Sequence, residues 1–479
     1  MGPPALLQRL NARASDLISN PPKLIYVFLL IVFLELEESV QKAPTIRLLE
    51  NAICSQHYQH EPNIGDIKES MCKTAPIQSK LAHIRGALSL FDAVPVILLG
   101  SFYGSLADRK GRRVPFAMAV FGRMWNRLPI EAVWASSVFR LIGGGPNLAI
   151  ALCLTMASDL STDDTRSKSF YRVFTASLVT DMISPTIAFA TLRHSLWLPY
   201  LVCSVSLLFT YPVLLWMPET QPHTKESDGL EDITVERTGL SAYLRFLKDW
   251  RIAIAVITVF LAQFRQNTLE ILLPYASVRF NMELGKTATL LSVVSAVNIV
   301  VFLILLPMAT TYLQEKQHVT SHRVNIWVAR TSSATLAIGA AALAAAPNIG
   351  LVVLALIIYA TGFGVRLSIL AVVTAFVSSK QETGRLYTMV ATTDAIAHMI
   401  ASPLLQWVWG RALTLGGRWI VLPFLVLMCI FLLAFGFSCF LQEPEACNPD
   451  DDLGAAEREA LLPEEERASG VEGSRVYTS

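Results

Sequence analysis

The sequence predicts an all-α integral membrane protein with about twelve membrane-spanning helices. The 479 residues are 53% hydrophobic and only 16% charged, whereas soluble domains carry about 25% charged residues. Apolar runs long enough for the roughly 20 residues of one bilayer crossing recur along the chain, for instance at 196–217 and 420–441. Lysine and arginine are more frequent in alternate short loops, which is typical of chains that cross a membrane many times.

The apolar runs fall into two near-equal groups separated by a polar, acidic segment. This pattern predicts an N-terminal six-helix bundle at 1–217, a cytosolic central loop at 218–250, a C-terminal six-helix bundle at 251–441 and an acidic, disordered tail at 442–479. The short loops on the same side of the membrane as the N-terminus carry more lysine and arginine than the loops on the other side. Because such loops face the cytosol and the number of spans is even, we expect both termini in the cytosol. The predicted spans are 24–43, 81–104, 114–131, 133–158, 170–192, 196–217, 251–275, 287–312, 323–345, 349–377, 386–409 and 418–441.

Composition and motifs exclude several other classes of protein. A net charge of +1 without a basic stretch gives no reason to expect a nucleic-acid partner. Cysteine spacing does not resemble a zinc site, so we expect no metal and no cofactor. The phosphate-binding sequence Gly-x4-Gly-Lys-Ser/Thr is missing, so ATP is not the expected energy source. Cys54 and Cys72 share a polar loop that this topology places outside the cytosol, and we expect a disulfide there.

A glycine-rich basic motif follows the second predicted span. The segment 104–113 reads Gly-Ser-Leu-Ala-Asp-Arg-Lys-Gly-Arg-Arg, which resembles the signature of the major facilitator superfamily between its spans 2 and 3. Further stretches, including Leu49–Cys54, Met71–Lys73, Met217–Thr220 and Trp419–Phe424, resemble the fungal branch of this superfamily, distantly akin to proton-coupled folate transporters. The alternative interpretation of the motif, without a specific function, is an ordinary cytosolic basic loop that faces anionic lipid.

The resemblance implies a secondary active transporter that works by alternating access, without enzymatic activity. We expect a small organic solute, protons and membrane lipid as partners, and a monomer in the plasma membrane or in a vacuolar or endosomal membrane. A non-transporting receptor that retains the fold is the alternative function. The resemblance also implies a conformational-switch motif made of Gly104, Asp108, Arg109, Gly111, Arg112 and Arg113.

Ionisable side chains at bilayer depth are expensive and therefore mark functional candidates. In the first span, Glu38 lies at a depth that matches Arg140 of the fourth span better than Glu35 does, although Glu35 is an alternative. Arg140 stands where the resemblance implies an arginine tied to proton coupling. The competing interpretation is a static ion pair without a role in transport.

Two aspartates occupy corresponding spans of the two predicted halves. Asp181 and Asp394 each follow a threonine and precede a Ser-Pro pair, and both lie near mid-membrane. His398 follows Asp394 by four residues, so the two side chains share a helical face and form a candidate proton-relay pair. A structural hydrogen-bonded pair and a chance repeat are the alternatives.

Polar residues crowd the predicted span 7. One packing face in hydrocarbon cannot absorb all of them, so they predict a substrate cavity, with a structural role as the alternative. In the predicted span 10, Arg366 is a second candidate for contact with an anionic solute. The cavity candidates are Arg265, Gln266, Asn267, Glu270 and Arg366.

Overall fold

The computed structural model describes residues 24–58, 68–110, 113, 116–118, 149, 152–153, 155–157, 160, 163–217, 250–313, 320–374 and 380–441. Within these ranges, only the backbone is described at 93–110, 163–172, 321–322, 367, 374, 380–389 and 391. Most of the predicted spans 114–131 and 133–158, the central loop and the C-terminal tail lie outside the described residues. The predicted boundaries of the two bundles therefore stay predictions.

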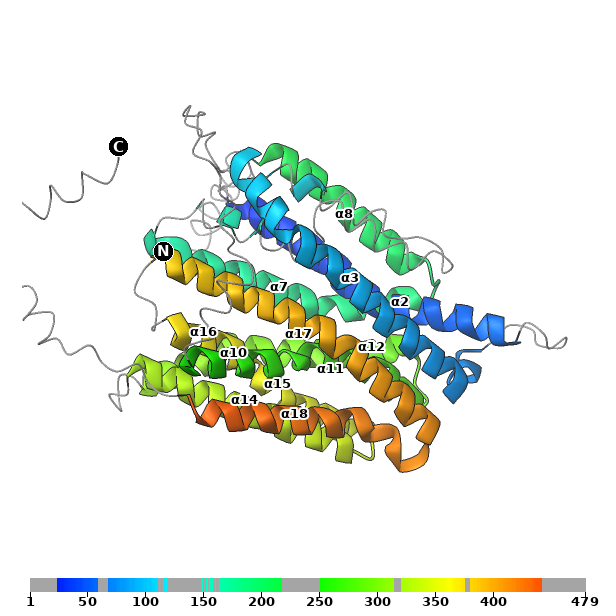
Figure 1. Ribbon diagram of the computed structural model, residues 1–479. Helices are drawn as coiled ribbons and strands as arrows, with labels where there is room; N and C mark the ends of the chain where they lie inside the picture. The colour runs from blue at the N-terminus through cyan, green and yellow to red at the C-terminus, as the bar shows by residue number, and fades with distance from the viewer. Residues whose placement is uncertain are drawn as a thin grey trace, which may run out of the picture. The chain divides into compact units, whose positions relative to one another are not determined.

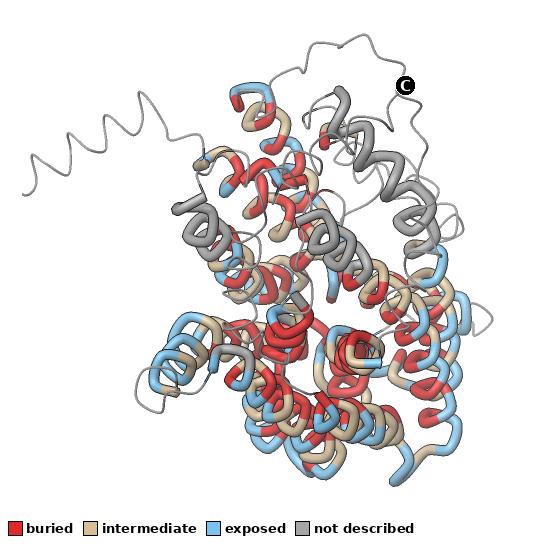
Figure 2. The backbone as a smooth tube through the Cα atoms, turned by 60° about the vertical axis from the view of Figure 1, so that its left-hand side comes forward, coloured by how far each residue is buried: buried red, intermediate tan, exposed pale blue. Residues whose placement is uncertain are grey.

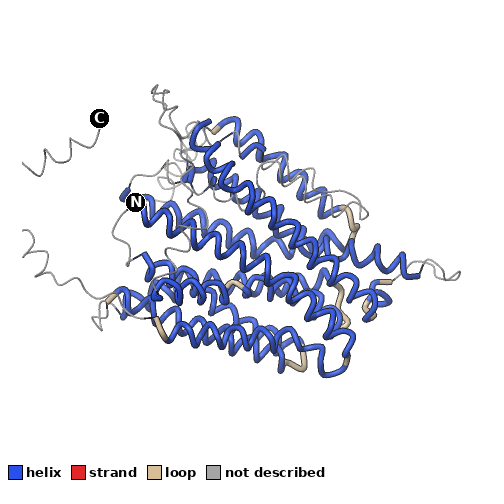
Figure 3. The backbone as a smooth tube through the Cα atoms, in the orientation of Figure 1, coloured by secondary structure: helices blue, strands red, loops and turns tan. Residues whose placement is uncertain are grey.

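The regular elements of the described residues are all helical (Figures 1 and 3). The first half contains α2 (Leu24–Tyr58), η1 (Glu69–Cys72), α3 (Ala75–Lys110), α7 (Asp163–Leu192) and α8 (Leu198–Trp216). The second half contains α10 (Trp250–Ala262), α11 (Phe264–Arg279), α12 (Leu284–Val300), the π-helical turn η3 (Val301–Leu305), α13 (Leu306–Thr311), α14 (Ser321–Ala345), α15 (Ile349–Ala360), η5 (Thr361–Gly364), α16 (Val365–Thr374), α17 (Lys380–Leu415), η6 (Gly417–Val421) and α18 (Leu422–Cys439).

These helices are long enough to cross a bilayer. Seven described helical segments qualify as membrane spans by length and composition. Three more helices, α2, α3 and α17, have 35 or 36 residues, and a rise of about 1.5 Å per residue carries each of them beyond a hydrocarbon core of about 30 Å. All ten predicted spans that fall on the described residues overlap a helix.

Two helices extend beyond the predicted spans. The first predicted span ends at residue 43, but the helix α2 continues to Tyr58 with Pro44 buried inside it. Ile46, Leu49 and Ile53 form a buried stripe in this extension, and the spacing of three and four residues places them on one helical face. The second predicted span ends at residue 104, but the helix α3 continues to Lys110. The first seven residues of the basic motif are therefore helical rather than part of a loop.

Each half has its own apolar core, and a third apolar cluster joins the halves. One core is built on α2 and α8 with Phe116 and Cys153, and the larger one lies among α10–α12 and α14–α18. The third cluster contains Ile46, Leu49 and Ile53 of α2 together with Leu273 of α11 and Leu284 of α12. Figure 2 shows the buried residues on the faces where helices meet.

Two arginines make equivalent contacts in the two halves. Arg113 donates from Nη2 to the carbonyl oxygen of Leu214 at 2.8 Å, close to the end of α8. Arg330 of α14 donates from Nε to the carbonyl oxygen of Ser438 at 3.1 Å, close to the end of α18. A cation at the carbonyl end of a helix satisfies free acceptors and opposes the negative end of the helix dipole. The matching pair of contacts is what an internal repeat would produce.

The halves meet along two pairs of helices. α3 packs along α17, and α7 packs along α12. Glycines permit close approach at both contacts: a Cβ on Gly86 of α3 would lie 3.3 Å from the Cα of Pro403 in α17, and one on Gly285 of α12 would lie 3.2 Å from the ring of Phe189 in α7. These contacts lie toward the end of the bundle that carries Cys54 and Cys72, here called the disulfide end.

The glycine at position 339 allows α14 to touch the backbone of α15. A Cβ on Gly339 would lie 2.6 Å from the Cα of Tyr359, and backbone atoms cannot move aside cheaply. We expect Gly339→Ala to lower the free energy of unfolding by about 1–3 kcal/mol. Gly436→Ala is the matched control, because no atom lies within 4 Å of its added Cβ, and a neutral or slightly stabilising change is expected there. Thermal unfolding in detergent measures both; equal melting temperatures would contradict the prediction.

Candidate functional site

Two membrane-spanning helices of the second half are interrupted near their middle. Gln263 separates α10 from α11, and the short turn η5 separates α15 from α16. The two interruptions lie together, because the guanidinium of Arg265 lies over the ring of Phe363 at 4.4 Å from its centroid. The hydroxyl of Tyr359 donates to the carbonyl oxygen of Arg265 at 3.2 Å. Interrupted helices of this kind are where transporters commonly form solute and ion sites.

Arg265 is a cation that lacks a carboxylate partner among the described residues. Its Nε is buried and makes no hydrogen bond, and its guanidinium is stabilised by the Phe363 ring and by the charge of nearby Asp394. The neighbouring arginine is paired: Nε of Arg366 lies 2.6 Å from Oδ2 of Asp394. The second carboxylate oxygen of Asp394 is also buried without a hydrogen bond. The site therefore contains one buried donor and one buried acceptor that have no hydrogen-bond partner among the described residues.

The structure gives Asp394 and His398 different partners. Asp394 binds Arg366, whereas Nδ1 of His398 lies 3.2 Å from the side-chain nitrogen of Asn267. The predicted Asp394–His398 pair is therefore not formed in this structure. Sharing a helical face was not sufficient, because Arg366 on α16 offers Asp394 a charge-assisted hydrogen bond and Asn267 on α11 contacts His398.

An acidic cluster lies between α2 and α7 in the first half. It contains Glu35, Glu38 and Asp181, with Ser39 and Lys42 between them. Ser39 donates to Oδ1 of Asp181, and Nζ of Lys42 donates to Ser39 Oγ at 3.3 Å. Positions 35, 38, 39 and 42 share one face of α2. Three carboxyl groups around one ammonium can exchange protons without exposing an unpaired charge to hydrocarbon.

Contacts between α3, α11 and α17 bring polar groups of the two halves together. Arg85 of α3 donates to the carbonyl oxygen of Glu270 at 3.3 Å, and Ser402 of α17 donates to its carboxylate at 3.4 Å. Glu270 also attracts the ammonium of Lys42. Arg85 and Lys42 belong to the first half, whereas Glu270 and Ser402 belong to the second. Glu270 therefore lies where the halves face each other.

Sequence reasoning missed Lys42, Arg85 and Ser402. Arg85 lies inside a predicted span, so its intramembrane charge alone could have indicated it. Lys42 was placed at the edge of the first span, and only the extension of α2 to Tyr58 puts it in the middle of a helix. Ser402 was noted in the Ser-Pro pair, but its contact with Glu270 depends on packing between helices distant in sequence.

The remaining predicted residues are placed as follows. Gln266 is exposed and accepts a hydrogen bond from Gln263 at 3.1 Å. Gly104, Asp108 and Arg109 lie on α3, where only the backbone is described. Arg113 binds carbonyl groups near the end of α8. Gly111, Arg112 and Arg140 lie outside the described residues, so the predicted pair of Arg140 with Glu35 or Glu38 stays a prediction.

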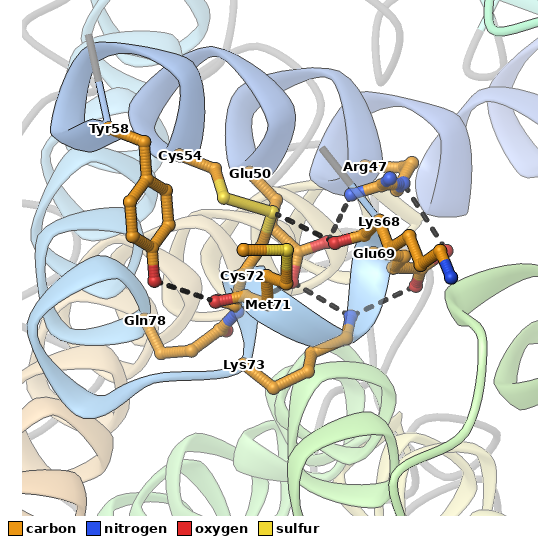
Figure 4. Close-up of a disulfide and its surroundings, with 10 residues drawn as sticks. All are labelled: Arg47, Glu50, Cys54, Tyr58, Lys68, Glu69, Met71, Cys72, Lys73 and Gln78. Atoms are coloured by element: carbon orange, nitrogen blue, oxygen red, sulfur yellow. Dashed lines mark hydrogen bonds and ion pairs between the residues drawn. A yellow bond between two sulfur atoms is a disulfide. The ribbon is translucent and has the colours of Figure 1, made fainter. Parts of the chain in front are cut away.

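The disulfide end carries a covalent bond and a network of charges (Figure 4). Cys54 and Cys72 form a disulfide with a Cα–Cα distance of 5.4 Å, which is the pairing expected from the sequence. Next to it the fully buried Glu50 accepts hydrogen bonds from Arg47, Lys73 and Gln78. Among the described residues, no group of three His, Cys, Asp or Glu side chains could hold a metal ion.

Comparison with known proteins agrees with this architecture. Residues 81–402, more than half of the chain, match the family model of the Major Facilitator Superfamily. The chain belongs to this superfamily. It is 27% identical to the MFS efflux pump atnC of Emericella nidulans, over 86% of each chain. It is 25% identical to the efflux pump ustT of Aspergillus flavus, over 82% of this chain and 83% of the relative.

Solved structures of major facilitator proteins share the fold. A D-xylose–proton symporter superimposes with a TM-score of 0.59 at 17% identity, covering 88% of this chain and 97% of that one. The human organic anion transporter MFSD10 gives 0.56 at 17% identity, covering 88% and 100%. The chain is therefore a multi-pass membrane transporter with the major facilitator fold. The resemblance to proton-coupled folate transporters and the receptor alternative gain no support.

Proposed function

We propose that this major facilitator protein is a proton-coupled exporter of a small organic solute that carries an anionic group. The observation that carries the proposal is the position of Arg265. Its guanidinium lies where two interrupted helices meet, and it has a buried Nε without a hydrogen bond. A carboxylate, sulfate or phosphate group of a solute would supply the missing acceptor.

The acidic cluster and Asp394 supply the coupling in this proposal. Glu35, Glu38 and Asp181 lie on the α2–α7 side, and Asp394 lies on α17 opposite Arg366. When water reaches these carboxyl groups alternately from the two sides of the membrane, protons can bind on one side and leave on the other. We infer outward transport from the two fungal relatives, which are named efflux pumps. In this proposal a single copy of the chain carries out the cycle. It does so in the plasma membrane or in a vacuolar or endosomal membrane.

Purified protein in liposomes with an entrapped pH-sensitive dye tests the proposal. Organic anions from a panel of carboxylates, sulfates and phosphates, and neutral organic solutes of similar size, are added one at a time, and the dye reports proton movement that requires both protein and solute. At least one anion should produce a signal that Arg265→Gln lowers about tenfold or more, the cost of one charge-assisted hydrogen bond. Arg418→Gln is the matched control, since Arg418 is exposed in η6. A signal for neutral solutes alone would contradict the proposal.

A further inference from the structure

A carboxylate from the first half binds the helix end of the second half. Oε1 of Glu69, in η1, accepts a hydrogen bond from the backbone N–H of Leu284 at 2.8 Å. Leu284 is the first residue of α12, and the residue before it, Glu283, gives no side-chain cap. The N–H groups of a first helical turn need an acceptor and favour a negative charge. Glu69 supplies both from a segment 215 residues away.

Glu69 is held in place by two cations of its own half. Nζ of Lys73 lies 2.9 Å from its Oε1, and Nε of Arg47 lies 3.3 Å from its Oε2. Both cations also bind Glu50, at 2.8 Å and 2.9 Å. Figure 4 shows the two cations between the two carboxylates. The side chain of Glu69 is only 21% exposed, so water competes weakly with these contacts.

The backbone that carries Glu69 is also fixed. The disulfide ties Cys72, the last residue of η1, to Cys54 of α2. The hydroxyl of Tyr58 donates to the carbonyl oxygen of Met71 at 3.3 Å. The apolar cluster that joins the halves includes both disulfide cysteines and Leu284. Glu69 therefore projects from a rigid platform on the first half toward α12 of the second half.

We propose that Glu69 is a latch that holds the two halves together at the disulfide end. The proposal rests on the alternating access of the proposed function, in which the halves separate at one end while they close at the other. In the state that is open at the disulfide end, the bond from Glu69 to Leu284 is broken, and the N-terminus of α12 loses its acceptor. The latch thus favours the state that is closed at this end, by the differential contact that it makes there.

The test measures the distance between the halves directly and needs no solute. Spin labels are attached to His194→Cys, between α7 and α8, and to Arg418→Cys, in η6, which are both exposed at the disulfide end. The background replaces the exposed Cys429 and Cys439 by alanine. Double electron–electron resonance then gives the populations of short and long distances. We expect Glu69→Gln to raise the ratio of long to short distances about tenfold, and Glu69→Ala to raise it at least as much.

Glu283→Gln is the matched control. It removes the same charge one residue before Leu284, but the structure pairs Glu283 only loosely with Lys286, at 3.9 Å and with both side chains more than half exposed. Its distance distribution should equal that of the unaltered protein. Unchanged distances in both Glu69 variants, or an equal shift in Glu283→Gln, would overturn the latch. Because distances are measured without transport, a failed latch and a failed exporter give separable results.

Discussion

Replacing Asp394 by asparagine is expected to abolish proton-driven accumulation while leaving solute exchange intact. Asparagine keeps the shape of the side chain and can still accept a hydrogen bond from Arg366, but it cannot bind or release a proton. In liposomes with an imposed pH gradient, the ratio of solute concentrations across the membrane should fall to about one. Exchange of labelled for unlabelled solute without a gradient should continue, because it needs only the binding site and the movement of the halves.

Loss of the ion pair between Arg366 and Asp394 should not unfold the protein. The side chain of Arg366 is 39% exposed and that of Asp394 13%, so loss of the ion pair leaves a cation that solvent can still reach. The protein should therefore remain folded, with a melting temperature close to that of Glu283→Gln. If the asparagine variant still concentrates solute, Asp394 only holds Arg366 in place. The coupling carboxylate would then be sought at Glu35, Glu38 or Asp181.

Sequence patterns predicted the helices but not their partners. Apolar runs placed all ten described spans, because burial in a bilayer is a property of one continuous segment. The end of α2 was missed because charged residues and Pro44 mask the buried stripe of Ile46, Leu49 and Ile53. That stripe faces other helices rather than lipid, so its apolar positions are spaced along one face instead of forming a run.

In the candidate site, the sequence likewise indicated single residues but not the contacts between them. Arg265, Glu270, Arg366 and Asp394 could be selected singly, since a charge at bilayer depth is visible in the sequence. Their pairing could not, because Asp394 was matched with its neighbour on α17 and actually binds Arg366 on α16. Glu69 carried no signal at all. Its role depends on the N-terminus of a helix in the other half, which only the folded chain brings within 2.8 Å.

Removing the disulfide between Cys54 and Cys72 should lower the free energy of unfolding at least as much as Gly339→Ala does. Cys54 and Cys72 are 18 residues apart, and closing a loop of that size stabilises a folded chain by about 3 kcal/mol. We expect Cys54→Ala with Cys72→Ala to lower the melting temperature in detergent, and reductant to lower that of the unaltered protein equally. Cys429→Ala with Cys439→Ala, which changes two free cysteines, is the control. Maleimide reagents should label Cys54 and Cys72 only after reduction.

The same variant tests whether the disulfide positions Glu69. Without the bond, η1 keeps the contacts of Lys73 and Arg47 with Glu50 and Glu69, but it loses its covalent tie to α2. Glu69 should then meet Leu284 less often, and the halves should separate more readily at this end. Glu69→Gln would consequently change the distance ratio less in this background than in the unaltered protein, because the two changes act on one contact. Equal effects in both backgrounds would show that the charge network alone positions Glu69, and that the disulfide contributes only stability.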